Sequence, residues 1–179
     1  APRVAVPLKD VDMAIRAARP TQGDMIMRKL GDMAYGLYGS KAYLQEHGHP
    51  QELSDLAGHS LIGFSRNDSP FGPIWWMSRA EKVGEIAFRS SSAAARARAV
   101  LDSNGLAVLP CVVGDVEPEM DRVFGPDIVG SLELWLLTRN DLAQQAHVRA
   151  VMEFMVEVVR RARSELEGDP RRLTELPPK

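Results

Sequence analysis

The fold is decided by one stretch of sequence, Arg89-Ser90-Ser91-Ser92-Ala93-Ala94-Ala95-Arg96-Ala97-Arg98-Ala99-Val100-Leu101, which leads into Ser103-Asn104-Gly105-Leu106-Ala107-Val108-Leu109-Pro110. Serine is favoured at the start of a helix and alanine inside it, because serine caps free N–H groups and alanine loses no side-chain entropy. Asn-Gly is typical of a helix end, and the apolar run after it indicates a short buried strand. The stretch therefore predicts a strand-helix-strand unit.

The first turn of that helix is a candidate anion site. Its backbone N–H groups have no partner within the helix, and the peptide dipoles favour negative charge there. Ser90, Ser91 and Ser92 add three hydroxyl groups at the same point. A small carboxylate is the ligand that suits this arrangement. The alternative is that one serine caps the helix and the other two are solvated.

Length and composition are typical of a soluble globular protein. The chain has 179 residues, of which 45% are hydrophobic and 26% charged, enough for one large domain or two small lobes. Its net charge of −2 does not indicate the clustered basic surface of a nucleic-acid-binding domain. Cys111 is the single cysteine, so an internal disulfide is excluded. With no long apolar run and no secretion signal, we expect a cytoplasmic protein without a membrane partner.

Short strands and helices are predicted along the rest of the chain. The last helix, from His147 onward, has apolar residues at spacings of three and four, which indicates an amphipathic helix. Residues 74–77 and 83–88 are expected to form an antiparallel pair, in which one of Trp75 and Trp76 must face outward. The other expected strands are 11–16, 25–30, 33–38, 61–64 and 132–137, and the other expected helices are 41–46, 51–56 and one turn at 111–115, before a polar connection at 117–121.

Seven spaced motifs resemble the effector-binding domain of LysR-type transcriptional regulators. The resemblance covers nearly everything from Asp10 to about Glu167, and the motifs follow one another in the family's order. They are Asp12-Met13-Ala14-Ile15-Arg16 with Ala18-Arg19-Pro20 and Gly23-Asp24, Arg28-Lys29-Leu30-Gly31, Ala34-Tyr35-Gly36-Leu37-Tyr38-Gly39-Ser40, Tyr43-Leu44 with His47-Gly48, His59-Ser60-Leu61-Ile62-Gly63-Phe64, Asn104-Gly105-Leu106-Ala107-Val108-Leu109-Pro110, and Leu134-Trp135-Leu136-Leu137.

The resemblance implies an α/β fold of two lobes, like that of type II periplasmic solute-binding proteins, joined by two crossover strands with a small effector between them. Lobe I would comprise residues 1–60 and 116–167, lobe II residues 61–115, and residues 168–179 a flexible tail. The self-contained α/β pattern of the middle block is consistent with a lobe inserted into another.

Two departures from the family pattern concern the N-terminal side. Family members begin this domain with a strand, a helix and a second strand before the Asp-x-Ala-Ile-Arg motif, whereas Ala1–Lys9 precede it here. We therefore expect lobe I to be truncated. The helix-turn-helix region that the family carries upstream is also missing from this sequence, so contact with DNA is expected through a domain outside this chain.

The resemblance also implies site residues. Ser90, Ser91 and Ser92 would face the cleft, Arg16 would supply a positive charge from the other lobe, Phe64 and Ser65 would lie at the mouth, and Pro110 would shape the floor. Arg16 is equally well explained as a surface charge. Relatives pair side by side, so we expect a homodimer, with a tetramer for the full-length protein.

Other candidate sites are weaker. His47-Gly48-His49 has metal-like spacing, but no Cys or acidic cluster completes a zinc shell. Cys111 is expected to be a buried structural thiol. There is no Gly-x-Ser-x-Gly, phosphate loop or dinucleotide glycine pattern, so we expect neither a cofactor nor enzymatic activity. Two alternatives to the regulator remain open, namely a free-standing solute-binding protein of the same fold and a small α/β hydrolase or transferase.

Overall fold

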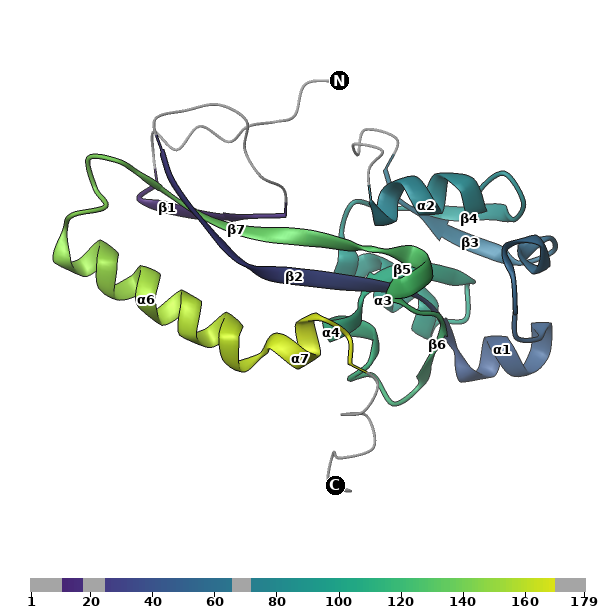
Figure 1. The fold of residues 1–179 in the computed structure, drawn as a ribbon. Coiled ribbons are helices and arrows are strands. Elements are labelled where there is room, and N and C mark those ends of the chain that lie inside the picture. The colour runs from purple at the N-terminus through teal and green to yellow at the C-terminus, as the bar shows by residue number, and fades with distance from the viewer. Residues whose placement is uncertain (1–10, 18–24, 66–71, 170–179) are drawn as a thin grey trace.

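The computed structural model describes residues 11–17, 25–65 and 72–169, which form strands and helices in alternation (Figure 1). Along the chain the elements are β1 (Met13–Arg16), β2 (Met25–Ser40), α1 (Lys41–His47), the 3-10 helix η2 (Leu53–Leu56), β3 (Ser60–Gly63), α2 (Pro73–Ala80), β4 (Glu85–Arg89), α3 (Ala93–Leu101), β5 (Leu106–Pro110), α4 (Cys111–Gly114), β6 (Met120–Phe124), α5 (Pro126–Val129), β7 (Ser131–Arg139), α6 (Ala146–Arg161) and α7 (Arg163–Leu166).

Strand β2 is shared by two sheets. Its residues 25–34 pair with β7, which pairs with β1, and these antiparallel strands form the first sheet. Its residues 35–40 pair with β5 and β6, and β5, β3 and β4 continue the second sheet in parallel. Figure 1 shows β2 and β7 running from one end of the molecule toward the other. The two separate strands predicted at 25–30 and 33–38 are thus one strand, with a register shift between Lys29 and Gly31.

Helices cover both faces of the second sheet. Leu106 and Val108 of β5 face a core that includes Trp76 and Met77 of α2, whereas the intervening Ala107 and Leu109 face a core that includes Val100 of α3. This follows from the twofold alternation of side chains along a strand. α6 lies along the first sheet (Figure 1), where the position of a Cβ on Gly31 would be 3.6 Å from Val159 Cγ1.

The predicted antiparallel pair of 74–77 with 83–88 is wrong. Residues 73–80 form helix α2, with Pro73 at its first turn, and β4 pairs in parallel with β3. Trp76, Met77 and Ala80 are buried on one face of this helix, and Trp75 is 52% exposed. The prediction that one of the two tryptophans faces outward therefore holds, on a helix instead of a strand. Strand β6 lies partly in the predicted polar connection 117–121.

The amphipathic C-terminal helix is confirmed, but part of its apolar surface faces outward. Val148 and Val159 are buried, whereas Val151, Phe154 and Val158 are 40–63% exposed. Within the described residues no helix has the length and apolar character to cross a membrane.

Residues expected in lobe I also contribute to the second sheet. Tyr43 and Leu44 of α1 and Phe124 of β6 belong to the same core as Leu61 and Leu106. The lobe boundaries at 60/61 and 115/116 stay predictions. Of the predicted tail 168–179, residues 170–179 lie outside the described residues, as do the loop residues 66–71.

A buried histidine links α1 to β3. Tyr43 Oη accepts the N–H of Ser60 at 2.9 Å and lies 3.2 Å from Nδ1 of His59, to which its own hydrogen is available. Burial lowers the pKa of His59 below its ordinary 6.5, the charge on nearby His47 adds to this, and Asp55 opposes it. As the pH falls, the unfolded state therefore binds a proton on His59 at a higher pH than the folded state does. The contribution of His59 to the free energy of unfolding is complete above about pH 6.5 and decreases as the pH falls below it.

We predict that acidification from about pH 7.5 to about pH 5.5 lowers the melting temperature more in the parent protein than in His59→Gln. The exposed His49 provides the control, since His49→Gln should keep the parent's pH dependence. Calorimetry across the pH range measures this difference. If the melting temperature changed equally with pH in the parent and in His59→Gln, the lowered pKa of His59 would not be the cause of the pH dependence.

Candidate functional site at the carboxyl ends of the parallel strands

Parallel pairing brings most of the predicted site residues to one edge. β3 pairs in parallel with both β4 and β5, so the carboxyl ends of the three strands lie on the same side of the second sheet. Phe64 and Ser65 follow β3, Ser90 follows β4, and Pro110 is the last residue of β5. In α/β folds, ligands bind outside the carboxyl ends of parallel strands. This edge is therefore the place at which a ligand is expected.

The serine turn starts helix α3 through two of its three hydroxyl groups. The Ser90 N–H donates to the carbonyl of Gly63 at 3.0 Å, which joins the turn to β3. Ser90 Oγ accepts the N–H of Ser92 at 3.1 Å, and Ser92 Oγ caps the helix by accepting the N–H of Ala95 at 3.3 Å. Ser91 is exposed at the tip of the turn. Ser92 is thus the one helix cap that the alternative to ligand binding expected, whereas Ser90 is not simply solvated because its hydroxyl accepts a backbone N–H. Ser91 is left as the strongest candidate contact.

Arg96, which was not among the predicted site residues, carries a positive charge at this edge. Its side chain is 2% exposed, its Nη1 donates to the Ser90 carbonyl at 2.8 Å, and its Cζ lies 4.1 Å from the centre of the Phe64 ring. A guanidinium over an aromatic face is held there by electrostatic attraction. Arg96 lies four residues before Val100, which is fully buried, so the helical period indicates the same inward face.

Arg89 joins the end of β4 to the end of α2 through an ion pair and to the end of β3 through a hydrogen bond. Arg89 donates from Nη1 and Nη2 to the two carboxylate oxygens of Glu81, at 2.8 Å and 2.7 Å, and Nη1 also donates to the Phe64 carbonyl at 3.2 Å. Such bidentate pairs fix geometry as well as contributing energy. Arg89 therefore holds the backbone of Phe64, and the guanidinium of Arg96 lies over the Phe64 ring.

Tyr35 and Pro110 complete the floor of the edge. They are opposite each other where β2 pairs with β5, and both are buried. Burial raises the pKa of Tyr35, and the positive charge of Arg96 partly offsets this rise. The hydroxyl group of Tyr35 is therefore neutral and close enough to Arg96 to be affected by its positive charge.

Arg16 lies on the other sheet. It is opposite Trp135 on β7, and Trp135 is opposite Lys29 on β2. Pro110 is opposite Tyr35, six residues further along β2, a strand distance of roughly 20 Å. Arg16 is thus not brought into the cluster around Ser90.

The remaining candidates have structural explanations. His47 stacks on Tyr43 with ring centres 4.2 Å apart, and the described residues contain no group of three or more His, Cys, Asp and Glu side chains suited to a metal ion. Cys111 is fully buried, and burial raises the pKa of its thiol. What the edge offers chemically is therefore a fixed positive charge beside a helix start.

We predict that Arg89→Met lowers the free energy of unfolding by about 1–3 kcal/mol, because Glu81 and the Phe64 carbonyl lose their donors. The matched control is Arg98→Met, which removes the exposed Arg98–Asp102 pair and should change stability by less than about 0.5 kcal/mol. Urea denaturation measures both. Equal effects of the two substitutions would show that the Arg89 pair has no special role.

Comparisons with known proteins agree with this fold. The family model described as the LysR substrate binding domain matches residues 6–160. The probable HTH-type transcriptional regulator LtrA of Klebsiella pneumoniae is 26% identical over 163 residues, which are 83% of this chain and 51% of that protein. The HTH-type transcriptional regulator DmlR of Escherichia coli is 25% identical over 151 residues, 81% of this chain and 49% of that protein. The chain thus spans about half the length of these relatives.

Solved structures show the same architecture. The regulatory domain of CrgA, a LysR-type transcriptional regulator from Neisseria meningitidis, superimposes with a TM-score of 0.68 at 23% identity, covering 83% of this chain and 75% of that one. The regulatory domain of CcmR from Synechocystis PCC6803, solved in complex with 2-PG, gives a TM-score of 0.64 at 11% identity, with 83% and 73% covered. The α/β fold is therefore the two-lobed, periplasmic-binding-protein-like fold of these regulatory domains. Because the family model matches most of the sequence, this chain belongs to the LysR substrate binding domain family.

Proposed function

We propose that this domain is the sensor of a LysR-type transcriptional regulator and that it binds a small anionic metabolite at the carboxyl ends of β3, β4 and β5. One observation carries the proposal. Arg96, 2% exposed, is fixed between the Phe64 ring and the Ser90 carbonyl beside the start of α3. A fixed cation next to helical N–H groups favours an anion over a neutral ligand.

The other proposed contacts are arranged around this charge. Ser91 would donate a hydroxyl hydrogen bond from the turn, with Ser90, Ser92, Phe64, Ser65 and Pro110 forming its surroundings. Arg16 lies on the first sheet, roughly 20 Å along the strands from Pro110, so we do not propose it as a contact to the same ligand. CcmR, which has the same fold, was solved with 2-PG bound. That complex supports a small-molecule ligand for this chain without specifying which one.

Signalling would follow from a population shift. A ligand that contacts both lobes favours the arrangement in which both sets of contacts are made, and its differential affinity sets the size of the shift. We propose that a homodimer passes this shift to DNA-binding domains outside this chain, with a tetramer in the full-length regulator. A regulator that acts on DNA works in the compartment of the DNA, so the cytoplasm is the expected location.

The regulatory role is favoured over the two alternatives. LtrA, CrgA and DmlR are named as HTH-type transcriptional regulators, which are neither solute-binding proteins nor enzymes. We therefore propose ligand binding without turnover. The binding partners are a small effector, a second copy of the chain and, through another domain, DNA.

We predict that a panel of small carboxylates and phosphate esters contains a compound that stabilises the parent protein. At about one hundred times its dissociation constant such a ligand adds about 2.7 kcal/mol, which raises the melting temperature by several degrees. Ser91→Ala should weaken this shift, and Arg96→Met should abolish it because the fixed charge is removed. Differential scanning fluorimetry measures both effects.

The control is Arg98→Met, which removes an exposed positive charge from the same helix. It should leave the ligand-induced shift unchanged. Uncharged amide analogues of the best ligand should give no shift. The proposal would be overturned if the same compounds stabilised the parent, Ser91→Ala and Arg96→Met equally.

A further inference from the structure

Helices α6 and α7 connect the two sheets at the C-terminal side of the chain. α6 lies along the first sheet, and α7 continues from it toward α4 at the second sheet (Figure 1). α7 contacts α4 as well as β2. The turn after α7 ends at Gly168, which is buried. The end of this helical segment is therefore seated against the sheet opposite to the one that α6 covers.

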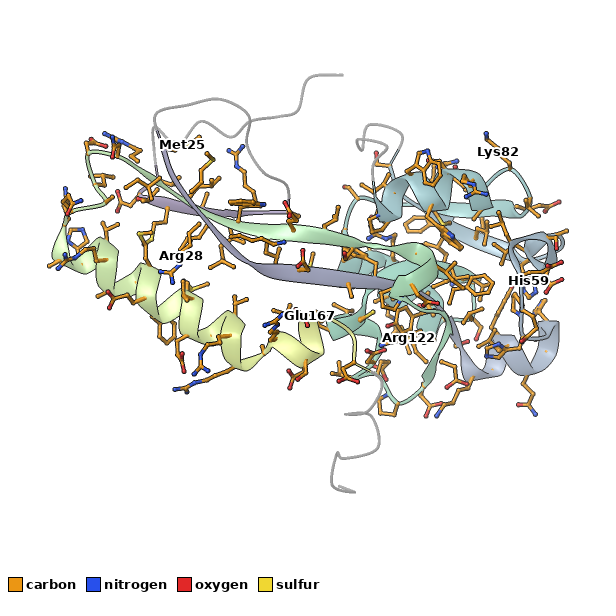
Figure 2. All side chains as sticks on the ribbon, in the orientation of Figure 1. Met25, Arg28, His59, Lys82, Arg122 and Glu167 are labelled. Carbon is orange, nitrogen blue, oxygen red and sulfur yellow. The ribbon has the colours of Figure 1, made fainter. Side chains whose placement is uncertain are left out.

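A side chain from β6 holds this turn in place. Arg122 Nη1 donates to the carbonyl of Gly168 at 3.1 Å. Figure 2 shows Arg122 beside Glu167, at the junction between α7 and the second sheet. The hydrogen bond is charge-assisted, so it is stronger than one between neutral groups. It joins the C-terminal turn directly to a strand of the second sheet.

Arg122 is itself fixed by two partly buried residues. Its Nε donates to Asp115 Oδ1 at 3.0 Å and to Tyr38 Oη at 3.1 Å, and its Nη2 pairs with Asp115 Oδ2. Tyr38 donates its hydroxyl hydrogen to Asp115 Oδ1 at 2.7 Å, and burial raises the pKa of Tyr38, so that this hydrogen is retained. The side chains of Arg122 and Asp115 are 15% and 12% exposed. The guanidinium therefore has little freedom to follow the turn if the turn moves.

Gly168 fits its place closely. Its φ of +68° lies in the region that favours glycine, and a Cβ there would be 2.8 Å from Cys111 Sγ and 3.4 Å from Ala34 Cβ. Cys111 belongs to α4 and Ala34 to the point where β2 passes from the first sheet to the second. The turn is thus packed on the junction between the sheets.

We propose that the turn at Gly168 is a latch, in which the carbonyl held by Arg122 fixes the end of the α6–α7 segment against the second sheet and thereby restrains relative motion of the two lobes. The chain passes between the two sheets twice, within β2 near Ala34 and at Gly130 between α5 and β7, and these two crossings lie side by side because the Tyr35 N–H donates to the Gly130 carbonyl at 3.0 Å. The contact at Gly168 is an attachment away from these crossings, so it opposes rotation of one sheet relative to the other. Opening the latch allows hinge motion of the kind seen when two lobes close around a ligand. The latch uses none of the residues proposed to bind the effector.

The test compares two ways of opening the latch. Arg122→Lys keeps a positive charge beside Asp115 but cannot reach Tyr38, Asp115 and the Gly168 carbonyl together, because lysine lacks the planar fork. Gly168→Ala leaves the Arg122–Asp115 pair intact and displaces the turn from Cys111. The matched control is Arg163→Lys, which alters the exposed Arg163–Glu167 pair on α7 without touching the latch.

The readout is the distance between two spin labels, one on each lobe. Glu153→Cys on α6 and Lys82→Cys before β4 place the labels at exposed positions on the two sides of the molecule (Figure 2 labels Lys82). Cys111 is fully buried, and a sample without the added cysteines checks that it is not labelled. Pulsed electron-electron double resonance then gives the distribution of distances.

We expect one narrow distance in the parent and in Arg163→Lys. Arg122→Lys and Gly168→Ala should each populate a second distance, with the equilibrium shifted about tenfold, as expected from the loss of a charge-assisted hydrogen bond. Hydrogen exchange of the α7 amides should accelerate by a similar factor. If Arg122→Lys does not fold, Gly168→Ala decides the outcome. A parent distribution as broad as those of the variants, or variants that match the parent, would overturn the proposal.

Discussion

The structure depends on the continuity of β2. Sixteen residues, from Met25 to Ser40, form one strand that pairs with β7 in the first sheet and with β5 and β6 in the second. The chain crosses between the sheets a second time where α5 leads from β6 into β7, and there the Tyr35 N–H donates to the Gly130 carbonyl at 3.0 Å. The pairing of β2 with β7 in the first sheet has a register shift between Lys29 and Gly31. The continuous strand and this neighbouring crossing therefore join the two sheets along the chain.

A buried charge imposes the second constraint. An arginine taken out of water must find aromatic, carbonyl or carboxylate partners, because desolvation of a cation is costly. Arg96 finds two of these at the strand ends, the Phe64 ring and the Ser90 carbonyl, and Arg89 holds Phe64 in place. The same contacts that satisfy the guanidinium fix its position. The positive charge at this edge of the second sheet therefore has a fixed position.

Several elements could be predicted because their signals are local. One of the three serines, Ser92, caps α3, the helix expected at 41–46 begins after the cap Ser40, and the apolar run at 106–110 is a fully buried strand. The family motifs also predicted the fold, because they preserve spacing along the chain. Helix α2 was missed because Ile74-Trp75-Trp76-Met77 has strand-forming residues, whereas its conformation depends on packing against distant residues such as Phe124. β6 was missed because an edge strand with Asp121 and Arg122 outside the core has no clear apolar alternation.

The sequence by itself determined the family, the helix caps, the central buried strands and the cluster of serines, since each is encoded in neighbouring residues. The tertiary structure decided where the serine turn lies, because the Ser90 N–H bonds the Gly63 carbonyl of β3 only in the folded chain. It also placed Arg96 at the carboxyl ends of β3, β4 and β5, and Arg122 beside the turn at Gly168. Both arginines resemble surface charges in the sequence. Arg122 contacts Tyr38, which is 84 positions away, and Gly168, which is 46 positions away, and at such separations local pattern carries no information on contact.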